Sequence, residues 1–158
     1  MFSLFRSPPF ADTVLGALRR KGGVWRGTIG LGDAVVPLAV PGPRSAPDPH
    51  AIDLARAAPS SYPAWRPTIA AALFDHYEPY AGAARLDDLD RAHDHAPRIG
   101  RPDEVWRHVR VAFVAVRLLG GERCIEIAYD VAWDDEHTLG ARMRDGHLIE
   151  LNGSVLRP

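Results

Sequence analysis

Short apolar runs separated by glycine-containing turns fill the C-terminal third of the chain. Residues 108–119 are rich in valine, and Gly120 and Gly121 after them are typical of a two-residue hairpin turn. Asp145 followed by Gly146 is the strongest turn signal in the sequence, and it predicts a type I′ turn between strands at residues 138–144 and 147–151. The pattern predicts a C-terminal meander of at least four antiparallel strands.

The first of these hairpins divides its side chains between two faces of the sheet. If Leu119 lies opposite Glu122, one face is nearly all apolar and the other is mixed. We expect the apolar face to form the core and the longest helix to pack against it. The apolar face has the pairs Val116–Ile125, Val114–Ile127, Ala112–Tyr129 and Arg110–Val131, and the mixed face has Arg117–Cys124, Ala115–Glu126, Phe113–Ala128 and Val111–Asp130.

Two helices are expected in the middle of the chain. The connector at residues 41–49 is rich in proline, and Asp48 is a good N-cap with Pro49 at the first helical position, so a helix is predicted from there to about residue 58. A longer helix is predicted over residues 63–81, because its apolar side chains recur at steps of three and four. These side chains are Trp65, Ile69, Ala72, Leu73, His76, Tyr77 and Tyr80.

The N-terminal part predicts a short helix followed by a hairpin. Residues 11–20 offer Asp12 or Thr13 as an N-cap and an apolar side, with Gly22 and Gly23 after them as a stop. Strands are expected at residues 24–29 and 34–40. Pro37 lacks an N–H group, which favours a sheet edge or an outward-facing amide position for the second strand.

These elements together predict the α+β class. We expect an antiparallel meander sheet of four or more C-terminal strands packed on one long helix, with an N-terminal helix and β-hairpin. Residues 85–101 are charged and broken by proline and glycine, which indicates a surface loop. The chain has 158 residues, so we expect residues 1–158 to form a single domain with a substantial core.

Composition narrows the classes of partner. The hydrophobic fraction of 46% and the charged fraction of 25% are typical of a globular protein. With a net charge of -1 and no clustered basic face, no nucleic-acid partner is expected. No apolar run approaches the roughly 18 residues of a membrane helix, and the first ten residues do not resemble a secretory signal. We therefore expect a cytoplasmic protein without a membrane partner. Cys124, the sole cysteine, is expected to be a small buried side chain.

The densest polar cluster of the chain is the candidate site. Trp133, Asp134, Asp135, Glu136 and His137 crowd one expected bend between strands. Carboxylates beside an imidazole can bind a divalent metal ion or act as an acid–base pair. The alternative is a solvated turn in which aspartate caps its own backbone. Trp133 ends the core face of its strand, so we expect it to cover the core.

A second pair of possible metal ligands lies in the charged loop. His93 and His95 could supply two imidazoles, and together with Asp134, Glu136 and His137 they would suit zinc or manganese if the loop folds over the bend. Such pairs are also common in polar loops. The sequence contains no helical His-Glu-x-x-His, phosphate-cradling loop or nucleophile elbow, and no cofactor is expected otherwise.

The last part of the chain, residues 123–155, resembles the C-terminal signature of uncharacterised bacterial domains. In these domains a W-D-x-E-H-x-L-G turn is followed by a D-G hairpin, and here Trp133, Asp134, Glu136, His137 and Gly140 match the turn. The resemblance implies a fold and a bacterial setting. Some domains of this general sort are suspected immunity or stress-associated proteins, which implies binding in place of catalysis.

Two classes of function follow from these observations. The missing catalytic motif and the mixed sheet face favour a small non-enzymatic domain that binds another protein or forms a homo-oligomer. The alternative is a divalent-metal-binding protein or a metal-assisted hydrolase that uses the bend at residues 134–137. A small-molecule binder with a pocket between the long helix and the sheet is a third reading.

Overall fold

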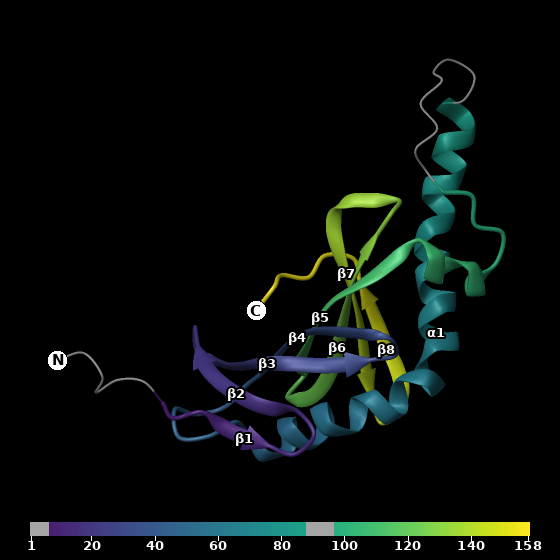
Figure 1. Cartoon of the computed structure of the whole chain (residues 1–158). Helices are drawn as coiled ribbons and strands as arrows, with labels where there is room; N and C mark the ends of the chain where they lie inside the picture. The colour runs from purple at the N-terminus through teal and green to yellow at the C-terminus, as the bar shows by residue number, and fades with distance from the viewer. Residues whose placement is uncertain (1–6, 88–96) are drawn as a thin grey trace.

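The chain forms one continuous sheet crossed by a long, bent helix (Figure 1). This computed structural model describes residues 7–87 and 97–158. The strands within that part of the chain are β1 (Phe10–Asp12), β2 (Gly16–Lys21), β3 (Val24–Leu31), β4 (Ala34–Val40), β5 (Val109–Leu119), β6 (Glu122–Val131), β7 (Asp134–Arg144) and β8 (His147–Asn152). The helices are α1 (Pro49–Asp87) and the short 3-10 helix η1 (Pro102–Arg107).

The eight strands follow one another in the sheet in chain order. All neighbours pair antiparallel except β4 and β5, which are parallel because α1 and η1 connect them. The predicted α+β class and C-terminal meander are confirmed, but the sheet also includes the N-terminal strands. β4 therefore lies between β3 and β5 inside the sheet. The prediction of a sheet-edge position for this strand, which was based on Pro37, is wrong. Its ladder with β5 has two pairs, Leu38–Val114 and Ala39–Ala115, and begins after Pro37.

The N-terminal helix predicted at residues 11–20 is wrong, because these residues form β1, a turn and β2. The Asp12 carboxylate accepts hydrogen bonds from the N–H groups of Val14 and Leu15, at 2.9 and 2.8 Å. It thus caps a turn instead of a helix. Gly22 and Gly23 have φ angles of 63° and 85°, as a type I′ hairpin turn requires, and this turn joins β2 to β3.

The two predicted helices are one helix, α1, whose 39 residues include Pro59, Pro63, Pro67 and Pro79. The predicted start is confirmed, since the Asp48 carboxylate accepts the N–H of Ala51 at 2.9 Å. Each proline removes one helical hydrogen bond, but Pro63 and Pro67 lie on an exposed face, where water can satisfy the freed carbonyl groups. The helix bends around the sheet (Figure 1), as proline-containing helices do.

The main core lies between α1 and one face of the sheet. Ile69 and Leu73 of α1 are fully buried, and so are Val114 and Ile127 of the sheet, which confirms the predicted core face. The predicted register is correct from Leu119–Glu122 to Phe113–Ala128. Beyond Phe113 it is wrong, because a β-bulge adds one residue and shifts the partners. The observed pairs there are Val111–Tyr129, Arg110–Asp130 and Val109–Val131.

On β5 and β6 the opposite face of the sheet is also buried. A smaller apolar cluster includes Phe113 and Val155, and a segment of residues 153–158, here called the C-terminal strap, lies across it. The Val155 N–H donates to the carbonyl oxygen of Thr138 at 2.8 Å. Glu126 is fully buried on this face and is paired with Arg117 and Arg142, at 3.0 and 2.8 Å. The predicted mixed face is therefore a covered surface around Glu126, and it offers a partner little open area.

Candidate functional site

The predicted bend is a turn followed by a bulge at the start of β7. Ala132 and Trp133 form the turn after β6, and Asp134 opens β7 opposite Val131. The next pair is Thr138 with Asp130, so residues 135–137 bulge out of the ladder. All three bulge residues are exposed. The predicted strand start at residue 138 is thus late by four residues.

Asp134 organises the bulge from a buried position. Its carboxylate, 6% exposed, accepts the hydroxyl of Tyr80 at 2.8 Å and the ring Nδ1 of His137 at 3.0 Å. It also accepts the backbone N–H groups of Glu136 and His137, each at 3.2 Å. Burial alone would raise the pKa of Asp134, but the hydrogen bonds from Tyr80 and His137 outweigh it and lower this pKa. The carboxylate is therefore a charged cap of its own backbone.

Trp133 covers the core as the sequence predicts. It is 6% exposed, its ring meets the Tyr77 ring edge-on at 5.4 Å, and its Nε1–H donates to Nδ1 of His76 at 3.1 Å. His76 must keep that nitrogen unprotonated to accept the bond, so its proton lies on Nε2. Burial lowers the pKa of His76, and the charge of Asp134 opposes this only in part. The histidine expected on the apolar face of the helix is thus a hydrogen-bonded structural group.

The structure brings Trp133, Asp134 and His137 together with two residues of α1 that the sequence did not assign to the site, His76 and Tyr80. Their rings lie 5.5 Å apart. The only sequence signal for them is their four-residue spacing on one helix face. The exposed bulge residue Glu136 contributes its backbone N–H to Asp134. Each of the five residues in the arrangement is hydrogen-bonded to another of them, so the cluster first of all fixes the bulge to the helix.

His137 is the chemically available group of this cluster. Its side chain is 45% exposed, and Asp134 holds its Nδ1, which leaves Nε2 as the nitrogen that can take a proton or a metal ion. Among the described residues, no group of three or more histidine, cysteine, aspartate or glutamate side chains could hold a metal ion. His93 and His95, the other predicted ligands, lie outside the described residues.

A second candidate surface lies between α1 and η1. A shallow pocket of about 510 Å³, here called the α1–η1 pocket, is lined by Pro63, Arg66, Pro67, Ala70, Pro102, Asp103 and Trp106. The Arg66 guanidinium lies 4.4 Å from the centre of the Trp106 ring, a cation–π contact. Trp106 is half-buried and lies in the short helix η1.

The fold and these two surfaces define a class: an α+β domain in which a bent helix packs on a chain-ordered sheet. The described residues contain no helix that is both long enough and apolar enough to cross a membrane. Residues 31–155 match the family described as Domain of unknown function (DUF6985), and the chain belongs to this family. The match extends well beyond residues 123–155, which carried the resemblance in the sequence. No curated protein and no solved structure matches the chain.

Proposed function

We propose that this chain is a non-enzymatic protein-binding domain and that its α1–η1 pocket receives an extended segment of another protein. The observation that carries the proposal is the composition of this pocket: an open surface of prolines around one tryptophan and one arginine. Tryptophan and arginine are enriched among the residues that dominate binding energy at protein interfaces. A bacterial, cytoplasmic setting and an immunity- or stress-associated role belong to the same proposal.

The prolines of α1 supply hydrogen-bond acceptors beside the pocket. Because Pro63 and Pro67 carry no N–H, the carbonyl oxygens of Pro59 and Pro63 lack the donor that a helix normally provides four residues later. These carbonyl groups lie on the same helix face as the proline rings. An extended peptide has backbone N–H groups of its own and can donate to them. The helix therefore offers a partner main-chain hydrogen-bond acceptors as well as apolar contact.

Arg66 adds a preference for an acidic partner segment. Asp103 lies in the same pocket but is paired with Arg101 at 3.0 Å. Among the described residues no carboxylate forms an ion pair with Arg66, whose guanidinium lies over the Trp106 ring. The N–H groups of a guanidinium lie in its own plane, so one that covers a ring can still donate two of them to a carboxylate. We expect the partner to place an aspartate or glutamate there.

The edges of the sheet favour a different protein over a second copy of this chain as partner. Strand pairing between copies would use β1 or β8, the two strands that end the sheet. β1 has three residues. β8 carries a bulge at Ile149, since Met143 pairs with Leu148 and Arg142 with Glu150. Short and bulged strands both discourage edge-to-edge pairing.

Site-specific photo-crosslinking in the native host tests the proposal. A photoreactive residue at Asp103, whose side chain is 69% exposed, reports on the pocket, and one at Val35, 76% exposed and on the opposite sheet face, is the matched control. We expect Asp103 to capture one protein, with the attachment mapped by mass spectrometry to an extended segment that contains an acidic residue. Equal capture from both positions, or attachment of Asp103 to a second copy of the chain, would contradict the proposal.

One observation supports divalent-metal binding as a second candidate. Carboxylate pairing at one histidine nitrogen, as Asp134 pairs with Nδ1 of His137, commonly orients the other nitrogen toward a metal ion. Metal content and thermal shift with zinc and manganese, for the wild type and a Glu136→Ala/His137→Ala double variant, test it. Stoichiometric metal and a stabilisation that the double variant loses would support a metal site and a search for hydrolase substrates. Identical shifts in both proteins would remove this candidate.

A further inference from the structure

Three prolines of α1 form a regular row on the helix surface. Pro59, Pro63 and Pro67 follow one another at steps of four residues, and residues four apart lie on the same helix face. Pro59 is half-buried, the other two are exposed, and Pro63 and Pro67 line the α1–η1 pocket. The ring of each proline also displaces the carbonyl group four residues earlier. The two carbonyl oxygens without a helical donor, on Pro59 and Pro63, are therefore one step apart in this row.

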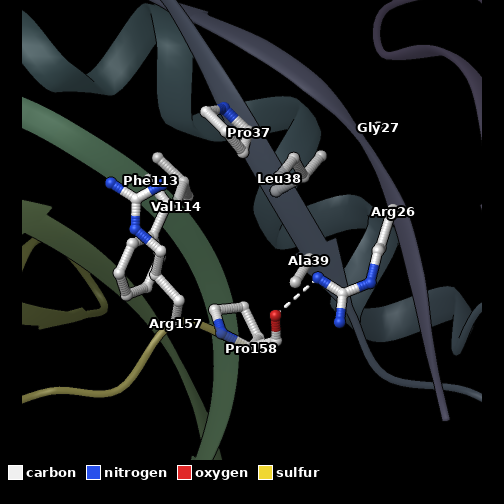
Figure 2. A pocket seen from close by; sticks show the side chains of 9 residues that line it. All are labelled: Arg26, Gly27, Pro37, Leu38, Ala39, Phe113, Val114, Arg157 and Pro158. Atoms are coloured by element: carbon white, nitrogen blue, oxygen red, sulfur yellow. Dashed lines mark hydrogen bonds between the residues drawn. The ribbon is translucent and has the colours of Figure 1, made fainter. Parts of the chain in front are cut away.

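The pocket on the other face of the sheet, between β4 and β5, differs in how its polar groups are used. There the C-terminal strap meets the charged side chain, because Arg26 donates a hydrogen bond to an oxygen of Pro158 (Figure 2). Beside the α1–η1 pocket the hydroxyl that follows Pro59 in the sequence, on Ser60, donates to the carbonyl oxygen of Ala57 at 3.0 Å. Ser60 thus does not replace the donor that is missing at Pro59, and a partner can supply it.

The distance between the two acceptors selects the backbone conformation that can reach both. Four residues of a helix rise about 6 Å. In a β-strand the N–H groups of alternate residues point to the same side and lie about 6.6 Å apart. In a polyproline II segment three residues make one turn, so N–H groups on one side lie about 9 Å apart. A helix uses its own N–H groups except in its first turn. The spacing therefore fits a β-strand.

A strand along this row would also present its side chains to the α1–η1 pocket. Successive side chains of a strand point to opposite faces, at right angles to the N–H groups. When the N–H groups point at the helix, the side chains of one face point across the pocket toward Trp106 of η1, and those of the other face solvent. A carboxylate on the first face can reach Arg66, which lies over the Trp106 ring. One strand face thus supplies both the apolar and the acidic contact.

We propose that the partner segment binds as a β-strand along α1, with the N–H groups of two alternate residues donating to the carbonyl oxygens of Pro59 and Pro63. This inference rests on the proposed function, because it specifies the segment that the α1–η1 pocket receives. The segment has no proline at the two donating positions, since proline lacks the N–H group. It carries an aspartate or glutamate on the face that points to Arg66, and β-branched or aromatic residues are expected around it.

Proline-to-valine variants remove the acceptors one at a time and keep an apolar side chain of similar size. Pro63→Val restores the N–H that bonds to Pro59, and Pro67→Val restores the one that bonds to Pro63. The probe is a synthetic peptide that copies the segment mapped by crosslinking at Asp103. We expect its Kd to rise about fivefold or more in each variant, with a Tm at or above that of the wild type, because a helical hydrogen bond is restored. The matched control is Pro79→Val, an exposed position of the same helix outside the pocket, which should stay within roughly twofold.

N-methylation of the peptide, one residue at a time, tests the strand register. With the wild type, binding should weaken about fivefold or more at two residues separated by one, because their N–H groups reach the helix. One of these losses should disappear in Pro67→Val, where the helix already satisfies that acceptor.

Three results would overturn the strand: no loss on methylation, losses at every third residue, or alternate losses that persist unchanged in both valine variants. Weaker binding by Arg66→Gln alongside any of them would leave the proposed function standing. A crosslink at Asp103 that captures no partner would remove the proposed function and this inference with it.

Discussion

Asp134→Ala should destabilise the protein much more than the same change at its neighbour Asp135. The substitution removes a buried carboxylate that accepts the Tyr80 hydroxyl, two backbone N–H groups and the His137 ring. Hydrogen bonds to a charged group contribute about 1.5–3 kcal/mol each. Their sum overestimates the loss, because His137 and the bulge are exposed and water can replace several of these contacts. We expect a decrease of about 2–3 kcal/mol in the free energy of unfolding.

Urea unfolding followed by tryptophan fluorescence measures this difference, and a lower midpoint with an unchanged slope would assign it to stability. For a chain of this length the same loss corresponds to a decrease in Tm of about 4–12 °C. Asp135→Ala, which removes an exposed carboxylate from the bulge, should stay within about 0.5 kcal/mol of the wild type. Equal midpoints for Asp134→Ala and Asp135→Ala would refute the assignment of Asp134 as the cap that fixes the bulge to α1.

The remaining predictions concern packing and pH. Trp133→Ala should lower the free energy of unfolding by about 3–5 kcal/mol in urea, because the ring is buried; an unchanged midpoint would contradict that burial. Gly140→Ala should lower it by about 1–3 kcal/mol, since the added Cβ would lie 2.5 Å from Val155, while Gly30→Ala, with no atom within 4 Å, is the mild control. Folding lowers the pKa of His76 from about 6.5, so its stabilising contribution is complete above pH 6.5 and decreases as the pH falls toward the lowered value. The wild type should therefore lose more stability between pH 7.5 and 5.5 than His76→Gln, and parallel losses would count against a neutral His76.

Local turn chemistry made much of the C-terminal half predictable. Asp145 and Gly146 have φ angles of 50° and 79°, and Gly120 and Gly121 have 61° and 83°, so both hairpins formed where these dipeptides predict them. The same chemistry leads to a wrong prediction at Gly22 and Gly23, because a glycine pair can end a helix or form a hairpin turn. Only the pairing of β2 with β3 decides between these outcomes, and that pairing depends on residues elsewhere in the chain.

The candidate site was predictable in part for a similar reason. Asp134 and His137 are three residues apart, so an aspartate that caps its own backbone could be foreseen from the sequence. Tyr80, which lies 54 positions before Asp134, meets it only because the bent α1 follows the sheet. The α1–η1 pocket likewise depends on long-range packing. No periodicity or motif near Trp106 indicates that this residue lines a pocket.

The partner identified by crosslinking at Asp103 allows the most direct test of where this protein binds. Its Kd should be measured with the wild-type chain, with Arg66→Gln in the α1–η1 pocket, and with His137→Ala at the exposed bulge, after equal thermal stability has been verified. The account predicts about tenfold weaker binding or more for Arg66→Gln, and a change within roughly twofold for His137→Ala. The reverse order would contradict it and would make the bulge the recognition surface.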